Sequence, residues 1–250
     1  MRENNVVRIE RKLGDKDLIL ETGKVANRSN GAVWIQYGET IVLVTAVISP
    51  VARENEGFVP LVVDYRERAY AAGKIPGGFF KREGKPSDEE ILCSRLIDRS
   101  IRPLFPEGFS NEVQIIATVL SAGESNQPAI LSIIGACLAL SISEYSFIEP
   151  IGGVRIGRVN KEFIINPQDK ELKESELNLV VVGNKEGLIM VEGEAHKLEE
   201  EVILSAFREA HSFIKRIIEV EEEFIFAAKK EKKEFSLYRI DEEIKKKVID

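Results

Sequence analysis

Residues 129–142 constrain the fold more than any other stretch, because this segment is apolar on every side of a helix. Pro128 stands just before it, at a position where a helix tolerates proline. Gly135, Ala136 and Ala139 add small side chains that let neighbouring elements approach closely. A helix that is hydrophobic all round is buried inside a protein. The sequence therefore predicts a central helix that other elements cover.

Composition is consistent with such a core and limits the class of protein. Of the 250 residues, 44% are hydrophobic, which suffices for one large domain or two small ones. The net charge of −7 argues against a protein that coats nucleic acid, so any RNA or DNA site must be a local basic patch. Cys93 and Cys137 have neither metal-ligand spacing nor a disulfide framework, which indicates a reducing compartment.

The sequence contains no membrane or secretion signal that we can identify. Residues 1–5 are polar and charged, without the apolar segment of a signal peptide. The apolar run at 129–142 is interrupted by Ser132 and Ser141 and is too short to span a bilayer. We expect a soluble cytoplasmic protein with no membrane partner.

Short stretches rich in valine and isoleucine predict strands before and after the central helix. Gly38 and Glu39 predict a two-residue hairpin turn between two of them. An amphipathic helix is predicted at 198–218, and a segment rich in lysine and glutamate follows residue 220. The predicted strands are 17–22, 32–37, 40–47, 58–65, 113–120, 153–159, 162–165, 177–182 and 187–192. Together these elements predict an α+β fold.

A further helix is predicted to begin at Asp88 and to end at Pro103. Ser87 and Glu90 have the spacing of a capping box. Apolar residues at helical spacing define one face, and arginines spaced four and three apart define another. The apolar face comprises Ile91, Leu92 and Leu96, and the basic face comprises Arg95, Arg99 and Arg102.

The stretch before this helix has the character of a binding loop. Glycines flank two adjacent phenylalanines, and two cations follow them. Single-stranded nucleic acid suits such a tip, because its bases stack on aromatic rings and its phosphates attract cations. The predicted RNA-binding residues of the tip are Phe79, Phe80, Lys81 and Arg82. Arg66 and Arg68, at the far end of the strand at 58–65, would project on one face and join them.

Simpler interpretations stand beside this one. Phe79 and Phe80 could pack against a neighbouring subunit, and the helix arginines could pair with Asp98 or Glu107. A P-loop nucleotide site is disfavoured, because no Gly-Lys-Ser/Thr follows the glycines. A GHMP-type kinase is disfavoured as well, because residues 127–130 lack its phosphate-binding turn.

The chain from residue 8 to residue 250 resembles the N-terminal half of bacterial polynucleotide phosphorylases. The stretches that carry the resemblance are 77–87, 94–109, 111–114 and 150–155. This resemblance implies an RNase PH-like α+β fold of mixed sheets around a buried helix, followed by a helical tail. It divides the chain into a first subdomain (1–145), a second subdomain of the same domain (146–225), and a linker with the start of a helical domain (226–250). We expect a fragment of a longer chain.

The family degrades RNA from the 3′ end by phosphorolysis and releases nucleoside diphosphates. Its aromatic loop lines the channel of a homotrimeric ring and grips RNA, so the resemblance assigns the same role to Phe79, Phe80, Lys81 and Arg82. The family commonly has arginine where this chain has Lys81, which loses planar stacking and bidentate contact with phosphate. Further implied partners are a second RNase PH-like domain of the same chain and an RNA-decay complex.

The family places its active site, with Mg²⁺ and inorganic phosphate, in the second RNase PH-like domain. At the matching position of a serine-rich phosphate turn, this chain has residues 127–130, with Pro128 and no hydroxyl. Asn178 and Val180 stand where the family has a metal-binding carboxylate and a lysine. We therefore expect no catalytic or metal-binding residues in this chain, which would be inactive alone.

The resemblance thus implies a polyribonucleotide nucleotidyltransferase to which this chain contributes an RNA-gripping wall and a scaffold for the trimer. One alternative is a non-catalytic RNA-binding ring subunit, similar to inactive RNase PH-like proteins of the exosome. A stand-alone RNase PH-like exonuclease is disfavoured by the missing site residues.

Overall fold

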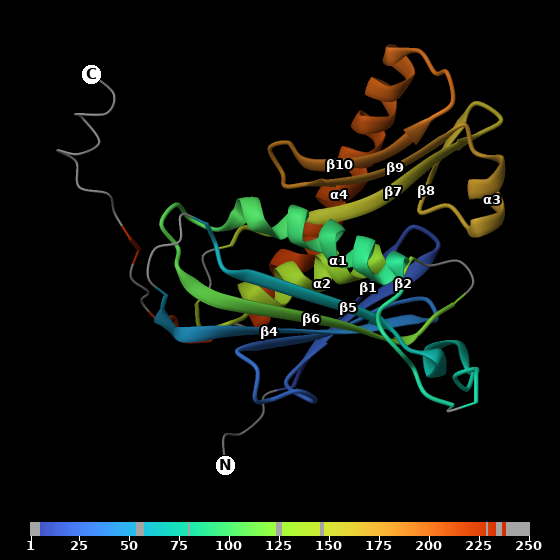
Figure 1. The fold of residues 1–250 in the computed structure, drawn as a ribbon. Helices are drawn as coiled ribbons and strands as arrows, with labels where there is room; N and C mark the ends of the chain where they lie inside the picture. Colours follow the sequence, from blue (N-terminus) through green and yellow to red (C-terminus); the bar gives the residue numbers. More distant parts are fainter. Residues whose placement is uncertain are drawn as a thin grey trace.

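The fold consists of two β-sheets with helices between them and behind the smaller one (Figure 1). The computed structural model describes residues 6–53, 58–79, 81–123, 127–145, 148–228, 230–233 and 237–238. No helix in these ranges is both long and apolar enough to cross a membrane.

The larger sheet has six strands in the spatial order β1, β2, β3, β4, β6, β5. Neighbouring strands are antiparallel, except that β5 runs parallel to β6 at one edge. The strands are Val7–Leu13 (β1), Lys16–Thr22 (β2), Gly31–Tyr37 (β3), Thr40–Ala52 (β4), Leu61–Glu67 (β5) and Asn111–Ser121 (β6). The predicted turn between β3 and β4 is present, and Gly38 has a φ of 58° there.

The smaller sheet has four antiparallel strands in the order β10, β9, β7, β8. The strands are Gly152–Val159 (β7), Glu162–Ile165 (β8), Leu177–Gly183 (β9) and Leu188–Ala195 (β10). A short helix, α3 (Asp169–Glu174), connects β8 to β9. Two 3₁₀ turns, η1 (Ala69–Ala72) and η2 (Arg102–Leu104), flank the helix α1.

The apolar helix α2 (Pro128–Ser141) lies between the two sheets, and every residue from 129 to 141 is buried. On one side a Cβ at Gly135 would meet Cγ2 of Val44 in β4 at 2.6 Å. On the other side β7 approaches through Gly153, whose missing Cβ would contact Ile130 and Ile133. The prediction of a covered central helix is confirmed.

Helix α1 (Asp88–Ile101) packs against β5 and α2. Its predicted capping box is present, because Ser87 Oγ accepts from the Glu90 amide and the Glu90 carboxylate accepts from the Ser87 amide. The predicted apolar face is partly wrong: Leu96 is buried, but Ile91 is 47% and Leu92 is 59% exposed. The buried face instead begins at Leu96 and continues through Ile97 and Ile101.

Helix α4 (Glu200–Ala227) packs on β7 and β9 and reaches β1. It extends beyond the predicted end at residue 218, because Glu221 and Phe224 continue its buried face. β1 and α3 were not predicted, and β5 begins after Pro60 rather than at residue 58. Of the predicted linker and helix start at 226–250, residues 229, 234–236 and 239–250 lie outside the described residues.

Candidate functional site

The segment between η1 and α1 carries the predicted stacking tip. Phe79 is 94% exposed, and Lys81 and Arg82 beside it are exposed as well. Gly78 and Lys81 have positive φ angles of 77° and 50°, so the chain turns sharply around the tip. Phe80, the other predicted stacking residue, lies outside the described residues. The segment projects from the end of the larger sheet near β5 (Figure 1, teal).

The three arginines of the predicted basic face have different surroundings, and Arg102 lies in η2, just after α1. Arg95 is exposed and makes no ion pair with any residue that the structure describes. Arg99 donates a hydrogen bond to the carboxylate of Glu192 in β10, which links α1 to the smaller sheet. Arg95 therefore offers an available cation, whereas the charge of Arg99 already has a partner.

Arg102 is held by several acceptors within the fold. Its guanidinium donates to both carboxylate oxygens of Asp98, at 2.8 and 2.5 Å. It also donates to the backbone carbonyls of Val59 at 2.7 Å and Leu61 at 3.4 Å. The hydrogen bond to Asp98 raises the pKa of Arg102. Arg102 thus joins α1 to the start of β5, and its role in RNA binding stays a prediction.

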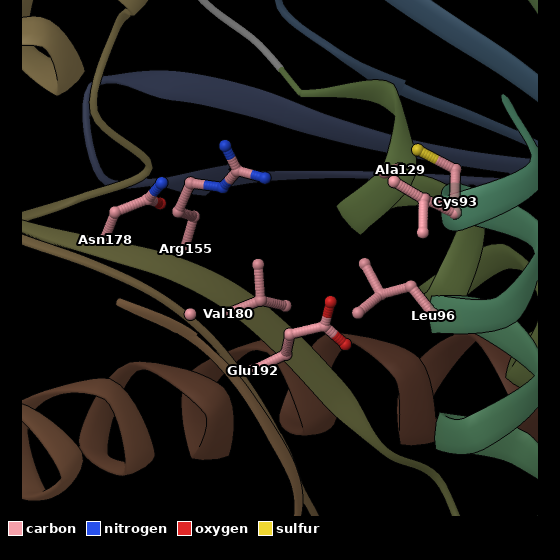
Figure 2. A pocket seen from close by; sticks show the side chains of 9 residues that line it. Cys93, Leu96, Ala129, Arg155, Asn178, Val180 and Glu192 are labelled. Atoms are coloured by element: carbon pink, nitrogen blue, oxygen red, sulfur yellow. The ribbon is translucent and has the colours of Figure 1, made fainter. Parts of the chain in front are cut away.

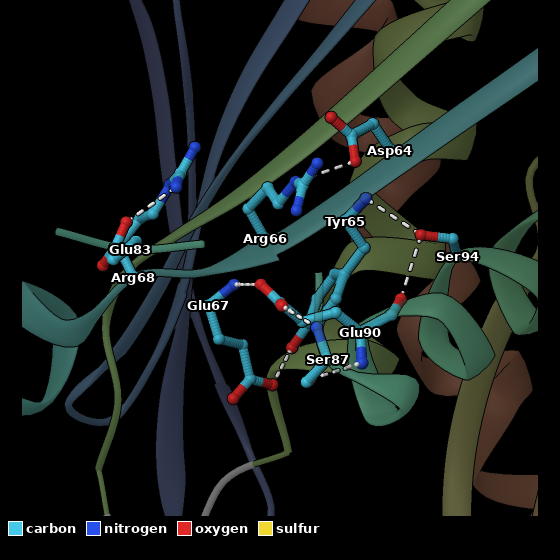
Figure 3. Close-up of polar contacts among 9 residues, drawn as sticks. All are labelled: Asp64, Tyr65, Arg66, Glu67, Arg68, Glu83, Ser87, Glu90 and Ser94. Atoms are coloured by element: carbon cyan, nitrogen blue, oxygen red, sulfur yellow. Dashed lines mark hydrogen bonds and ion pairs between the residues drawn. The ribbon is translucent and has the colours of Figure 1, made fainter. Parts of the chain in front are cut away.

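The two predicted arginines at the end of β5 also have acidic partners (Figure 3). Arg66 Nε lies 3.0 Å from a carboxylate oxygen of Asp64. Arg68 Nη1 donates at 2.6 Å to Glu83, which lies in the loop before α1. Among the predicted cations that the structure describes, Lys81, Arg82 and Arg95 are the ones without an ion pair in the described residues.

A pocket of about 200 Å³ opens between α1, the start of α2 and the smaller sheet (Figure 2). It brings together Ala129, Asn178 and Val180, which the resemblance assigns to the positions of a phosphate turn, a metal-binding carboxylate and a lysine. The full lining consists of Leu92, Cys93, Leu96, Ala129, Arg155, Asn178, Val180, Glu192 and Gly193. Positions far apart in the sequence therefore meet in one pocket.

The polar groups of this pocket do not fit a magnesium ion. Mg²⁺ prefers carboxylate oxygens and bound water. Glu192 is the one carboxylate in the lining, and it is paired with Arg99. The described residues contain no group of three or more His, Cys, Asp and Glu side chains placed to hold a metal. Burial raises the pKa of the Cys93 thiol to about 11, so this thiol is neutral near pH 7.

Among the described residues, the N-terminus of α2 offers phosphate one N–H fewer than usual and no hydroxyl. Helix α2 begins with Pro128, which has no N–H, and Ala129 follows without a hydroxyl. Arg155 is the cation of the lining, and burial lowers its pKa. Its Nε is buried and has no hydrogen-bond partner in the described residues. The lining residues that the structure describes thus place one cation, Arg155, and no hydroxyl in the pocket.

Sequence reasoning did not identify Arg155, Glu192 or Cys93 as neighbours. The available signal was that two arginines, Arg155 and Arg158, interrupt the otherwise apolar strand β7. Glu192 gave no signal, because β10 also carries Glu194 and both glutamates lie in its exposed part. Glu83 follows Arg82 in the sequence, but its pairing with Arg68 could not be read from the sequence.

Comparison with known proteins gives the family. The model of the 3′ exoribonuclease family, domain 1, matches residues 14–145, and the model of domain 2 matches residues 149–212. A polyribonucleotide nucleotidyltransferase of Thermodesulfovibrio yellowstonii is 50% identical over 97% of this chain and 34% of its own length. The Bacillus subtilis polyribonucleotide nucleotidyltransferase is 49% identical over 93% of this chain and 33% of its own length. The chain spans about a third of these relatives.

The fold has a counterpart among solved structures. The crystal structure of rice Rrp46 superposes with a TM-score of 0.64 and 15% identity, covering 89% of this chain and 95% of that one. The predicted RNase PH-like α+β fold is confirmed by this match and by the family models. Because a family model covers more than half of its residues, the chain belongs to the 3′ exoribonuclease family.

Proposed function

We propose that this chain is the first RNase PH-like domain, with the start of a helical segment, of a polyribonucleotide nucleotidyltransferase. The complete protein would shorten RNA from its 3′ end with inorganic phosphate and Mg²⁺ and release nucleoside diphosphates. The relatives that are about half identical to this chain over nearly all of its length support the proposal. The subdomains would be 1–145 and 146–225, with the linker at 226–250.

Within that enzyme, this chain would hold RNA without cleaving it. The observation that carries this division is the pocket lined by Ala129, Asn178 and Val180, which lacks hydroxyl, carboxylate and lysine at the positions where the chemistry would need them. The exposed tip at Phe79, Lys81 and Arg82 supplies an aromatic ring and cations for a single strand.

The proposed partners are single-stranded RNA 3′ ends, two further copies of the chain in a homotrimer, and the second RNase PH-like domain of the complete protein. An RNA-decay complex in the cytoplasm is the proposed setting. The same pocket also supports a second candidate function, a non-catalytic RNA-binding ring subunit. The two functions differ in whether a longer natural chain cleaves RNA.

The test is an assay of phosphorolysis. We expect no ADP from poly(A), phosphate and Mg²⁺ with the 250-residue chain, and ADP release when the same gene's full reading frame is expressed. The Bacillus subtilis enzyme serves as the positive control. ADP release by the 250-residue chain would refute the claim that it lacks the site. An inactive full-length product would favour the ring-subunit function.

RNA binding by the tip is tested separately. Stacking of one base on an aromatic side chain is worth about 1–3 kcal/mol. We therefore expect Phe79→Ala to weaken oligo(A) binding by about fivefold or more at moderate salt. Unchanged affinity in a fluorescence titration would exclude Phe79 from the RNA interface.

A further inference from the structure

The end of β5 and the end of the tip segment are tied together by two carboxylates (Figure 3). The amide of Ala69 donates to Glu83 Oε1 at 2.6 Å, and Arg68 Nη1 donates to Glu83 Oε2 at 2.6 Å. Two residues before Ala69, the amide of Glu67 donates to Glu90 Oε1 at 2.9 Å. Each carboxylate therefore fixes a backbone amide just where the chain leaves the sheet.

The second carboxylate also fixes the start of α1. Glu90 Oε2 accepts from the Ser87 amide at 2.7 Å, while Glu90 Oε1 holds the Glu67 amide. Ser94 Oγ accepts from the Tyr65 amide and donates to the Glu90 carbonyl, both at 3.0 Å. The helix N-terminus and the strand end thus share one set of hydrogen bonds, and the tip segment leaves and returns at this point.

Between these ties, the glycines of the segment have open surroundings. A Cβ placed on Gly73, Gly77, Gly78 or Gly84 would have nothing within 4 Å. Phe79, Lys81 and Arg82 are exposed. The hydrogen bonds of Glu83 and Glu90 described above, and the one that the Ala122 amide donates to the Ala71 carbonyl at 3.0 Å, all hold the segment at its base.

The charge of Glu83 has partners at the end of β5. The Ala69 amide and then the Arg68 guanidinium lower the pKa of Glu83, so its carboxylate is ionised near pH 7. Arg68 lies against it and offsets the charge. A negative residue next to Arg82 would otherwise repel RNA phosphates, and this pairing explains how a basic tip can contain one.

We propose that Glu83 is a positioning residue: through Ala69 and Arg68 it closes the base of the tip segment and presents Phe79, Lys81 and Arg82 to RNA in a preformed arrangement. The inference rests on the proposed function, because it names how that RNA-binding tip is held. Arg68 acts in this device as the partner of Glu83 rather than as a phosphate ligand. A preformed tip loses less conformational freedom on binding than a loose one.

The direction of the change in RNA affinity distinguishes a positioning role of Glu83 from a purely electrostatic one. Removing a negative charge next to cations would by itself tighten the binding of a polyanion. We instead expect Glu83→Ala to weaken oligo(A) binding by about two- to tenfold, from the ordering of one or two extra side chains. Glu83→Gln keeps an acceptor for the Ala69 amide and should weaken binding less. Glu89→Ala, which removes an exposed acid from α1, is the matched control and should not weaken binding.

A double-mutant cycle completes the test. If Glu83 acts through the tip, Glu83→Ala should weaken binding much less in a Phe79→Ala background than in the unchanged protein. Equal weakening in both backgrounds, or tighter binding by Glu83→Ala alone, would overturn the inference. Thermal unfolding of each variant identifies those that fail to fold, and Glu83→Gln then provides the comparison. If Phe79→Ala itself has no effect, the RNA-binding tip fails instead.

Discussion

At the scale of single residues, Arg95 in α1 and Arg102 in η2 show how similar side chains of one predicted face acquire different roles. Arg95 is exposed without an ion pair among the described residues, while Arg102 donates to Asp98 and to the carbonyls of Val59 and Leu61. We expect Arg102→Ala to lower the free energy of unfolding by about 1 kcal/mol, because three acceptors lose a charged donor that is still 38% exposed.

Arg95→Ala should leave the free energy of unfolding within about 0.5 kcal/mol of the parent, since an exposed side chain is removed. It should weaken oligo(A) binding instead. Urea unfolding and an RNA titration on both variants measure the contrast. A destabilised Arg95→Ala protein with unchanged RNA affinity would contradict the assignment of Arg95 to RNA binding.

Glu221 is a second residue whose environment makes a measurable prediction. Both of its carboxylate oxygens are buried and have no hydrogen-bond partner among the described residues. Burial, and then the neighbouring Glu222, raise the pKa of Glu221 well above the ordinary value of 4.5. The carboxyl is therefore neutral in the folded protein over a pH range in which the unfolded chain ionises it.

The sign of the pH dependence follows from this difference. The stability associated with a protonated Glu221 is complete below about pH 4.5 and is lost as the pH rises toward the folded-state pKa. We expect Glu221→Gln to remove this loss, so its advantage over the parent in urea unfolding grows as the pH rises above 4.5. Glu219→Gln, an exposed change on the same helix, should show no such trend. A constant difference across the range would contradict the prediction.

At the scale of elements, local sequence signals predicted where helices begin, but they did not predict which other elements the helices contact. The capping box at Ser87 and Glu90 and the apolar run after Pro128 act within a few residues, so α1 and α2 begin as predicted. The length of α4 depends on contacts with β1 and β7, which a local pattern does not contain. β1 was missed because its charged residues mask Ile9 and Leu13, which are the ones that face the core.

In the candidate site too, features within one stretch of sequence could be predicted, whereas contacts between distant elements could not. The exposed tip at Phe79 could be predicted from adjacent residues, because glycines, aromatics and cations all lie in one stretch. The pairs Arg68–Glu83 and Arg99–Glu192 could not, because each joins two elements whose relative placement depends on the whole fold. The resemblance supplied the pocket positions, and the structure supplied Arg155 as a further lining residue.

At the scale of the whole molecule, the net charge of −7 makes the tip a local exception. Charges further away than about 10 Å are screened at moderate salt, so RNA responds mainly to the cations near it. Each phosphate contact with a single strand contributes about 0.7 to the slope of log affinity against log salt. If Lys81 and Arg82 each contact one phosphate, each should contribute about 0.7 to that slope.

We expect the double substitution of Lys81 and Arg82 by alanine to reduce the salt slope for oligo(A) by about 1.4, because two phosphate contacts are lost. Arg53→Ala is the control. It removes one positive charge that is paired with Glu112 at 2.8 Å, near the opposite end of β6 from the tip. Titrations at several salt concentrations give both slopes. A slope that the double substitution leaves unchanged would place the RNA phosphates elsewhere, because loss of affinity without loss of slope is the signature of disturbed stacking rather than of missing cations.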